Sequence, residues 1–354
     1  MIEREWVTGK KPFVSVIMPV FNEAGCIRRV MDSVLAQDTS DFNLEVLVID
    51  GRSTDETASI IAEIAAENQR VRLLDNPHRK TPFAFNIGLK EARGEYVCIL
   101  GAHTIYPRNY IAVCLRELLR TGATGSSGRV KTVPRGDTIS ARMVAWCLDS
   151  RFASSTGSVR TQASGFVDTI PYPLMRKDAL LALGGYDERL SRNQDNDMNE
   201  RLRARGHRLY LTPLVTCTYC GPPNVSALFR YAYRSGRWNA LTFTRKPKSI
   251  SVRHLVPFAF VCGSILLATC SVLPAPTISS IAGDMLLIAL GSHLLAGAVA
   301  AIHTTIRTRS LSAMLLPAVI LGFHLAYGLG TLCGFLSMAA VSLTPVPRSL
   351  KSAE

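Results

Sequence analysis

The chain has 354 residues, which is enough for one large domain or two of medium size with a proper hydrophobic core. Its formal net charge of +13 at pH 7 indicates an anionic partner, which could be nucleic acid, an anionic membrane surface or a phosphate-rich substrate. Its nine cysteines are odd in number and follow no framework spacing, so they exclude a disulfide-stapled scaffold and predict free thiols in a reducing cytosol. Cys217 and Cys220 form one CxxC without a second pair, which disfavours a zinc site.

Strand-length apolar runs alternate with helical patterns along the first hundred residues. Strands are expected at 14–18, 44–49, 71–75 and 95–100, and helices at 24–36, near 55–68 and around 82–92. Ser53 and Glu56 have capping-box spacing at the start of the second helix, and Asp55 is expected to be structural because a carboxylate suits the dipole of the first turn. The alternation predicts a parallel sheet with helices on its faces.

Four loops follow the four predicted strands and should open at one edge of the sheet. In chain order they are PVFNE, DGRSTDET, NPHRK and GAHTIYP. Because ligands of such sheets bind at the carboxyl ends of the strands, these loops are the candidate binding site. No Gly-x-Gly-x-x-Gly follows the first strand, which argues against a dinucleotide fold. GATGSSG (122–128) leads into no helix and is interpreted as a turn.

The C-terminal third is apolar enough to predict membrane helices. Residues 255–273 and 285–302 carry no charge, and 311–341 contain no Lys, Arg, Asp or Glu. About 20 apolar residues cross the ~30 Å hydrocarbon core of a bilayer, so about three crossings are expected. The third stretch is long enough to be tilted, kinked or followed by an interfacial piece. A buried helical bundle is the soluble alternative.

Charge indicates which side of the membrane the soluble part occupies. Residues 176–254 carry fifteen basic and six acidic side chains directly before the first apolar stretch. The positive-inside rule puts the basic flank 228–254 and the Arg307/Arg309 loop in the cytoplasm, and the uncharged loop 274–280 outside. MIEREWVTGK is too charged for a secretory signal, so the soluble part is expected in the cytoplasm, on a multi-pass protein of the inner (plasma) membrane.

An ordered set of motifs resembles the signatures of inverting glycosyltransferase family 2. The motifs cover about residues 13–240 and are VSVIMPVFNE, VLVIDGRSTDET, AFNIGLKEARGEYVCIL, VDTIPYPLMRKDALLALGGYDERL, NQDNDMNERLRARG and RSGRW. The resemblance implies a GT-A domain, an α/β Rossmann-like fold with a mostly parallel sheet that binds a nucleotide-sugar. The predicted fold class is therefore a GT-A domain followed by C-terminal transmembrane helices.

A nucleotide donor needs a pocket for its flat base, with a carboxylate that accepts a base or ribose hydrogen bond. Asp50 ends the second strand and Glu23 lies in the neighbouring loop. The resemblance implies that both contact the uridine, and the alternative for Asp50 is that it only caps a turn. The resemblance also implies that Pro19, Phe21 and Gly51 belong to the nucleotide-sugar pocket.

The loop after the fourth strand departs from the family pattern. Members usually end this strand in Asp-x-Asp, whose last carboxylate binds Mg²⁺ or Mn²⁺ that bridges the donor diphosphate, but Gly101 and His103 stand here. A subgroup resembling succinoglycan-type glucosyltransferases of exopolysaccharide pathways carries an Ala-His followed by Tyr-Pro. This chain has Ala102 and His103 there, followed by Tyr106 and Pro107. Imidazole is an acceptable ligand for Mn²⁺-like ions. His103 is therefore interpreted as a ligand of a divalent cation or a direct partner of the diphosphate, and an ordinary loop histidine is the alternative.

An inverting transferase needs one base, which takes the proton of the acceptor hydroxyl as its oxygen attacks the anomeric carbon. Asp195, preceded by Gln194, matches the family's Glu-Asp or Gln-Asp base motif at the start of a helix. Asp197 is the alternative, but it should point to a different side of that helix. LGGYDE matches the loop that approaches the donor sugar, and Gly184 and Gly185 permit a close backbone approach.

RSGRW (234–238) resembles the QxxRW motif of membrane-bound, often processive members, with Arg234 in place of Gln. Because an arginine can neutralise a diphosphate, Arg237 is expected to bind it, and Trp238 is a candidate stacking platform for the acceptor. The plain alternative is a basic interfacial helix that holds the domain to anionic lipid.

These expectations divide the chain into four parts: a GT-A catalytic domain (1–228), a basic interfacial segment with RSGRW (229–254), a membrane domain (255–341) and a tail (342–354). The predicted function is transfer of a hexose, glucose from UDP-glucose, with inversion onto a lipid-linked saccharide in cell-surface polysaccharide biosynthesis. The expected partners are the UDP-sugar, the lipid-linked acceptor and membrane lipids, not nucleic acid. One alternative is a processive polysaccharide synthase, for which three apolar stretches look few. The other, a non-enzymatic membrane-anchored basic module, leaves Asp50 and Asp195 unexplained.

Overall fold

The computed structural model describes residues 11–155 and 157–343, without the side chains of 339–343. The charged segment MIEREWVTGK and nearly all of the predicted tail 342–354 lie outside the described residues. The chain forms two compact units. The first comprises residues up to 137 together with 148–221, and the second comprises 138–147 together with 222 onward.

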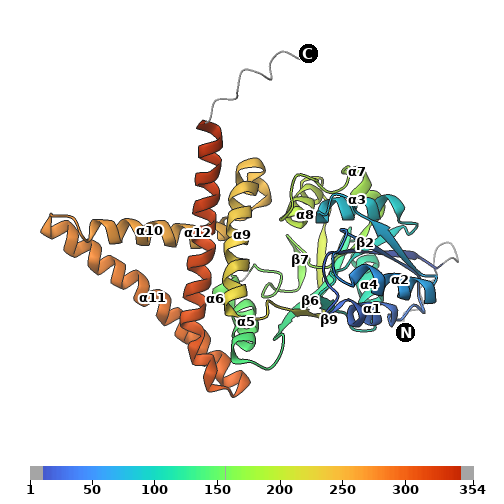
Figure 1. The fold of residues 1–354 in the computed structure, drawn as a ribbon, viewed down its shortest axis with the longest axis horizontal. Helices are drawn as coiled ribbons and strands as arrows, with labels where there is room; N and C mark the ends of the chain where they lie inside the picture. Colours follow the sequence, from blue (N-terminus) through green and yellow to red (C-terminus); the bar gives the residue numbers. More distant parts are fainter. Residues whose placement is uncertain (1–10, 156, 344–354) are drawn as a thin grey trace, which may run out of the picture. The chain divides into compact units, whose positions relative to one another are not determined.

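The first unit is built on a nine-stranded mixed sheet (Figure 1). The strands run in the order β3-β2-β1-β4-β8-β6-β9-β5, and β7 pairs with β9. Their bounds are β1 Phe13–Val20, β2 Asn43–Asp50, β3 Val71–Asp75, β4 Tyr96–Ile99, β5 Thr104–Ile105, β6 Gly125–Val133, β7 Gly165–Val167, β8 Leu174–Arg176 and β9 Leu209–Cys220. The four predicted strands are β1 to β4, and β1–β2, β2–β3 and β1–β4 all pair in parallel. The loops that follow them therefore open at one edge of the sheet, as expected.

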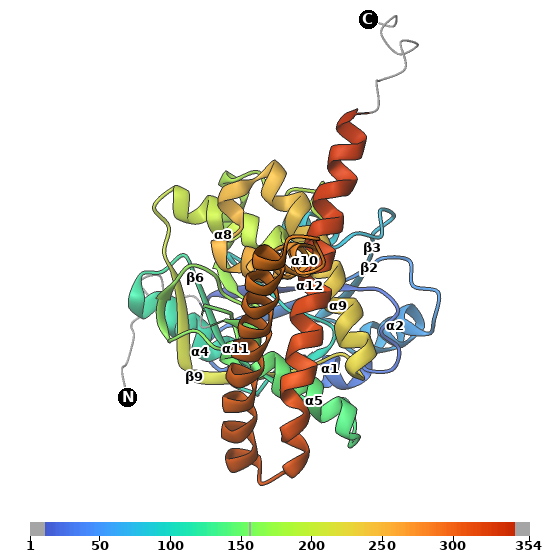
Figure 2. The same cartoon turned by 90° about the vertical axis from the view of Figure 1, so that its left-hand side faces the viewer.

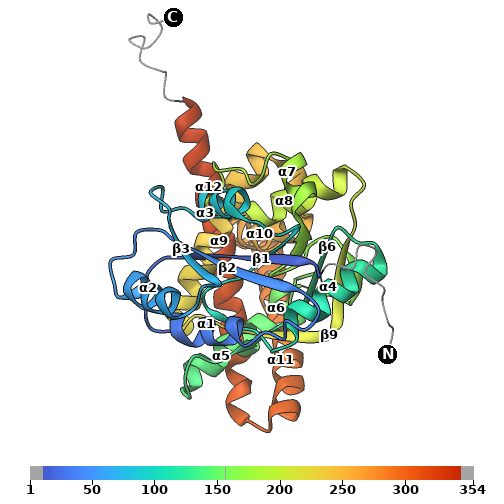
Figure 3. The same ribbon diagram turned by 90° about the vertical axis from the view of Figure 1, so that its right-hand side faces the viewer.

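Helices cover both faces of this sheet, as Figure 3 shows. One face packs against α1 (Ile27–Leu35), α2 (Thr57–Glu67) and α4 (Tyr110–Thr121), and the other against α3 (Thr81–Glu91), α7 (Lys177–Ala182) and α8 (Gln194–Ala204). The alternation along β1 explains the two layers, because successive strand residues point to opposite faces. Val16 and Met18 join the first core and Ile17 the second, all without exposed surface.

The strand order reverses between β1 and β4. From β1 the chain adds β2 and then β3 on one side, and it returns across both to place β4 on the other side of β1. Such a reversal leaves a crevice at the carboxyl ends of the two strands, where open α/β sheets bind ligands. The loops after β1 and β4, which hold Glu23 and His103, flank this point.

Two local predictions are wrong. The capping box does not form, because α2 begins at Thr57 and the Ser53 hydroxyl donates to Asp50 Oδ1 at 2.6 Å instead. The predicted turn 122–128 is a turn only at Gly122, a left-handed residue after α4. From Gly125 onward the segment is β6, which is buried between β8 and β9.

The second unit contains α5 (Ile139–Asp149, up to residue 147), α9 (Val225–Arg245) and three apolar helices, α10 (Val256–Cys270), α11 (Pro276–Thr308) and α12 (Leu316–Leu343). Short 3₁₀ turns at Val252–Leu255 and Leu311–Leu315 precede α10 and α12. Three stretches, Val252–Cys270, Pro276–Thr308 and Leu311–Met338, are long and apolar enough to cross a membrane. The loop predicted at 274–280 is mostly helical, because α11 already begins at Pro276.

Glycines let α9 lie directly on α12, and the two helices run side by side in Figures 1 and 2. A Cβ at Gly236 would collide with the carbonyl oxygen of Tyr327, and one at Gly330 would collide with that of Tyr233. A Cβ at Gly334 would lie 2.8 Å from the carbonyl oxygen of Arg237. The middle residue of RSGRW is therefore a packing residue that holds α9 against α12.

Candidate active site

The loops after β1 and β2 are tied together by hydrogen bonds around Asp50. The Asp50 carboxylate accepts from Ser53 N at 3.0 Å and from the Ser53 hydroxyl at 2.6 Å, and only 8% of the residue is exposed. Asn22 N donates to the Ser53 hydroxyl at 3.0 Å, and Thr54 N donates back to Asn22 Oδ1 at 2.8 Å. Asp50 thus caps a turn, which was the alternative given for it. It also lies at the carboxyl end of β2, where the sheet is expected to bind its ligand.

Asp55 has the structural role predicted for it, although it stands before α2 rather than within its first turn. Its carboxylate accepts from Thr57 N at 3.0 Å and from Ala24 N at 3.1 Å. The Thr57 hydroxyl in turn accepts from Glu23 N at 2.8 Å. These bonds fix the backbone of Glu23 against the start of α2.

The predicted wall of the pocket is partly open. Pro19 lies opposite Ile49 in the parallel pairing of β1 and β2. Gly51 follows β2, and a Cβ at this position would lie 3.4 Å from the Phe21 ring. Phe21 is 47% exposed, an unusual position for a large aromatic side chain beside a buried strand. An exposed aromatic face of this kind suits a flat base.

The GAH loop ends β4 because Tyr106 holds it. Gly101 N donates to the Tyr106 hydroxyl at 2.8 Å, and a Cβ at Gly101 would lie 3.0 Å from the Tyr172 ring. Ala102 is buried, and its carbonyl oxygen accepts from the Cys26 thiol at 3.4 Å. His103 is more open, with 42% of its side chain exposed. Its Nδ1 lies 3.6 Å from Glu23 Oε1, so the structure joins two of the predicted site residues.

Neighbouring groups keep Glu23 ionised. Burial alone would raise the pKa of Glu23, but hydrogen bonding from His103 and Cys26 and the charges of His103 and Arg135 bring it below its ordinary value. Cys26 shows the opposite effect, since burial and its bond to Glu23 raise the pKa of this thiol to about 12. The Cys26 thiol is therefore a donor to the carboxylate at neutral pH.

The side chains at this loop do not fit a protein-held divalent ion. Mg²⁺ and Mn²⁺ favour several oxygen ligands, whereas Glu23 and His103 contact each other and Cys26 keeps its proton. Within residues 11–155 and 157–343, no group of three or more His, Cys, Asp or Glu side chains could hold a metal. For the predicted Mg²⁺ or Mn²⁺, the described side chains of this loop thus offer Glu23 and His103 but no third protein ligand.

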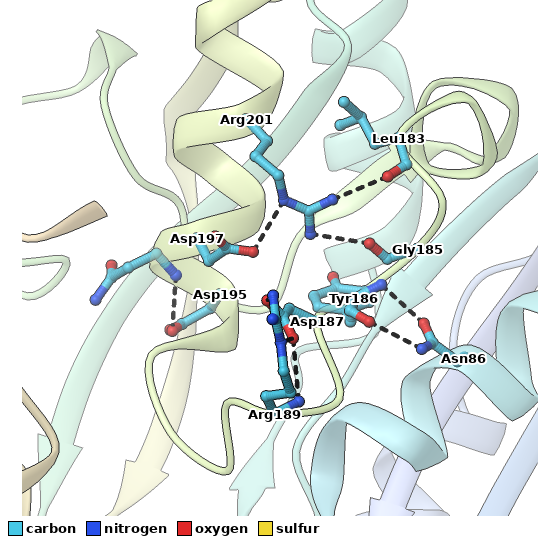
Figure 4. A network of polar contacts seen from close by, with 10 residues as sticks. Asn86, Leu183, Gly185, Tyr186, Asp187, Arg189, Asp195, Asp197 and Arg201 are labelled. Carbon is cyan, nitrogen blue, oxygen red and sulfur yellow. Dashed lines mark hydrogen bonds and ion pairs between the residues drawn. The ribbon is translucent and has the colours of Figure 1, made fainter. Parts of the chain in front are cut away.

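Asp195 and Asp197 differ sharply in their surroundings (Figure 4). Asp197 is 1% exposed and accepts from Arg201 Nε at 2.9 Å, so its charge is already paired. Asp195, in the first turn of α8, is exposed and accepts from Asn196 N at 2.8 Å. Its carboxylate is open to solvent yet has much protein around it, and this desolvation raises its pKa above the ordinary value. A raised pKa makes a carboxylate a better base.

The LGGYDE loop is fastened next to Asp195. Gly184 and Gly185 both have φ of +75°, which favours glycine. Asn86 of α3 accepts from Tyr186 N at 2.8 Å and donates to Tyr186 O at 2.9 Å. Burial, and then the charge of Asp195, raise the pKa of Tyr186, so the carboxylate lies near this loop.

Arg201 connects the two motifs. Besides Asp197, it donates to the carbonyl oxygens of Leu183 at 3.0 Å and Gly185 at 2.9 Å (Figure 4). One guanidinium therefore sets the LGGYDE loop against α8. Sequence reasoning missed both Arg201 and Asn86, although each lies inside a quoted motif.

Arg237 and Trp238 lie on α9, in the second unit. The resemblance placed them at the diphosphate and the acceptor, and these roles stay predictions. The structure adds that their motif sits on the glycine contact with α12.

A mixed α/β sheet with a topological switch point and an edge of polar loops is typical of a nucleotide-binding domain, and Asp195 adds an exposed carboxylate near the LGGYDE loop. Residues 15–184 match the family described as Glycosyl transferase family 2. The chain is 30% identical over 247 residues to the succinoglycan biosynthesis protein ExoA of Rhizobium meliloti (strain 1021), which covers 69% of this chain and 74% of that protein. The chain belongs to glycosyltransferase family 2, so it is an enzyme and not a binding module.

Two further likenesses concern the sequence and the fold. The chain is 24% identical over 260 residues to a Methanococcus voltae enzyme, dolichyl N-acetyl-alpha-D-glucosaminyl phosphate 3-beta-D-2,3-diacetamido-2,3-dideoxy-beta-D-glucuronosyltransferase, over 70% of this chain and 79% of that one. The fold of the present chain is similar to that of the mannosyltransferase PcManGT from Pyrobaculum calidifontis, solved with GDP-Man and Mn²⁺. The TM-score is 0.56 at 21% identity, over 92% of this chain and 91% of that chain.

Proposed function

We propose that this glycosyltransferase moves a hexose, glucose from UDP-glucose, with inversion onto a lipid-linked saccharide during assembly of a cell-surface polysaccharide. The observation that carries the proposal is Asp195, an exposed carboxylate of raised pKa beside the LGGYDE loop. The relatives' names support the acceptor class, since one names succinoglycan biosynthesis and the other a dolichyl phosphate-linked sugar.

Asp195 is the general base of this reaction. Its carboxylate takes the proton from the acceptor hydroxyl while that oxygen forms a bond to the anomeric carbon of the donor. The bond from this carbon to the diphosphate oxygen breaks with its electron pair, and the nucleoside diphosphate leaves as an anion. Attack on the face opposite the leaving group inverts the anomeric configuration. Asp197 cannot replace the base, because Arg201 holds its carboxylate in the interior.

The nucleotide lies along the loops after β1 and β2 in this proposal. Asp50 and Glu23 accept hydrogen bonds from the uridine, and Phe21 offers its exposed ring to the base. Gly184 and Gly185 let the backbone approach the sugar. Arg237 and Trp238 keep their proposed roles at the diphosphate and the acceptor.

Membrane attachment fits a lipid-linked acceptor. The three apolar helices are long enough to cross a bilayer, and a lipid-linked hydroxyl diffuses in the same two dimensions. We place the catalytic unit in the cytoplasm at the inner membrane, because the basic residues 228–254 lie directly before the first span. A protease-protection assay on right-side-out vesicles tests this orientation: the catalytic unit should resist external protease.

Turnover of radiolabelled UDP-sugars by purified membranes tests the proposed function. Asp195→Asn should lower the rate by roughly 10²–10⁴-fold, the usual contribution of a general base, without loss of nucleotide binding. Glu200→Gln on the same helix is the matched control and should leave the rate within about twofold. Full activity of Asp195→Asn would refute the assignment of the base.

A processive synthase is the alternative within the same family. Product length separates the two enzymes, because a single-addition transferase extends its acceptor by one sugar even when donor is in large excess. A ladder of long products from one acceptor would favour the synthase.

A further inference from the structure

α9 carries a stripe of arginines along the length that packs against α12. Arg230, Arg234 and Arg237 are all exposed, and their spacing of four and three residues puts them on one side of the helix. α9 contains no Asp or Glu, and Asp284 is the one acidic residue among the described residues of the second unit. The stripe is therefore a cationic surface that suits an anionic partner.

The contact between α9 and α12 is long and close. A Cβ at Gly322 would collide with the Phe229 ring, and a Cβ at Gly334 would lie 2.8 Å from the carbonyl oxygen of Arg237. These two glycines are about 18 Å apart along α12, at about 1.5 Å per residue. Over that length, contacting residues of α9 and α12 must share the same depth in a membrane.

This contact does not suit an α12 that crosses the bilayer. The hydrocarbon core is ~30 Å thick, so about 18 Å of contact would occupy more than half of it. Arginine is among the least favourable residues in that core, and α9 would bring in its whole stripe. The conflict is the same for either direction of α12, because the stripe runs along the contact from end to end.

The two other apolar helices indicate where the membrane surface lies along α12. α10 begins directly after the basic residue Arg253, and at this end a Cβ at Gly328 of α12 would collide with the carbonyl oxygen of Pro257. α11 ends beside the exposed Arg307, shortly before α12 begins. Because one short turn joins the far ends of α10 and α11, their basic ends lie at the same surface. α12 runs from one of these ends to the other.

The views of the second unit agree with this arrangement. In Figure 1, α10 and α11 diverge from their shared turn, and α12 runs across their open ends. Figure 2 looks along α10 while it shows α12 lengthwise. α11 has 33 residues, about 50 Å of helix, which suits a strongly tilted crossing of a ~30 Å core. The geometry therefore fits two crossings, with α12 along the membrane surface.

We propose that, of the described helices, only α10 and α11 cross the membrane, and that α9 and α12 lie together along the surface where α10 enters. There Arg230 and Arg234 bind the phosphates of anionic lipid headgroups, while exposed apolar side chains of α12, such as Leu329 and Leu336, reach the acyl chains. The end of α12 then lies on the same side of the membrane as α9. This differs from the three crossings expected from hydropathy, and it does not depend on which sugar the enzyme transfers.

Epitope tags on the full chain test the two crossings. Three versions carry one tag each, at the N-terminus, at the C-terminus or after Leu273 in the turn between α10 and α11. Sealed vesicles are treated with external protease, with and without detergent. The N- and C-terminal tags should be cut or protected together, and the tag after Leu273 should behave in the opposite way. A C-terminal tag on the other side from the N-terminal tag would mean that α12 crosses, and three tags on one side would mean that α10 and α11 do not; either result overturns the inference.

Binding of short-chain lipids to the detergent-solubilised full chain, measured by thermophoresis, tests the arginine stripe. Arg230→Gln/Arg234→Gln should bind dihexanoyl-phosphatidylglycerol about thirtyfold more weakly than the wild type, and Arg234→Gln alone about fivefold, because each arginine near an anionic surface contributes about fivefold. Binding of dihexanoyl-phosphatidylcholine should not change. The control Arg28→Gln/Arg116→Gln removes two exposed arginines and the same charge from the first unit, and should bind phosphatidylglycerol normally. Normal phosphatidylglycerol binding by both α9 variants, or equal weakening by the control, would overturn the lipid site.

Discussion

Gly184 and Gly185 offer a matched pair of substitutions in the LGGYDE loop. Both have φ of +75°, so alanine at either position enters the left-handed region at a cost of about 1–2 kcal/mol. A Cβ at Gly184 meets nothing within 4 Å, whereas a Cβ at Gly185 would lie 2.6 Å from Asn86 Oδ1. The two positions therefore share their backbone strain and differ only in this neighbour.

The Asn86 amide cannot move aside freely. Its Oδ1 accepts from Tyr186 N at 2.8 Å, and its Nδ2 donates to Tyr186 O and to Glu188 Oε1, both at 2.9 Å. Each bond contributes about 1 kcal/mol, so displacing the amide costs roughly 2–3 kcal/mol more. We expect Gly184→Ala to lower stability by about 1–2 kcal/mol and Gly185→Ala by about 3–5 kcal/mol.

Thermal unfolding in detergent measures both changes, at about 2–4 °C of Tm per kcal/mol for a unit of this size. A double-mutant cycle identifies the cause: in an Asn86→Ala background, Gly185→Ala should cost no more than Gly184→Ala. Equal losses for the two single variants, or an undiminished loss in that background, would refute the role given to Asn86. The kcat/KM for the donor should fall further for Gly185→Ala than for Gly184→Ala, because only the former moves the Tyr186 backbone.

Two further predictions concern the base and the glycine contact. The rate should fall as pH drops through the raised pKa of Asp195, hence at a higher pH than the ordinary 3.8 of an aspartate, and a kcat/KM profile that stays flat down to about pH 4 would contradict this. Folding raises the pKa of Asp195, so its stabilising contribution is complete below the unfolded pKa and is lost as pH rises through the folded pKa. Asp195→Asn, which cannot ionise, should therefore raise Tm at pH 7 and leave Tm unchanged below about pH 4. Gly236→Ala should destabilise the protein strongly, because its Cβ would collide with the Tyr327 carbonyl oxygen. Gly263→Ala is the control and should not, because its Cβ would have no neighbour within 4 Å. Similar melting curves for both variants would argue against the α9–α12 contact.

The strands β1 to β4 could be predicted because each is a short apolar run that ends at a polar loop, and their parallel order follows from the helices between them. The later strands β5 to β9 carried no such signal, and four of their pairings are antiparallel. Residue spacing could not predict that Ser53 turns to Asp50 instead of capping α2, because the outcome depends on how the loops after β1 and β2 fold together. The turn predicted at 122–128 rests on the absence of a following helix, yet β8 and β9 on either side bury Gly125 as strand.

The candidate site divides in the same way. Asp195 carried a motif, so its position was predictable, although its role as base stays a prediction. Asn86 was not singled out because its partner Tyr186 lies 100 residues away.

The place of α5 has a consequence for the order in which this chain is synthesised. Residues 138–147 belong to the second unit, where Ser140 Oγ accepts from Val225 N at the start of α9, but residues 148–221 are made in between. At the usual rate of translation that interval lasts roughly 4–15 s. The segment 138–147, in which Ala141, Met143 and Val144 are buried in the finished protein, is without the rest of the second unit for that time. A gene shortened after Gly221 would never supply the partner, so a soluble catalytic fragment needs α5 redesigned as well as the membrane helices removed.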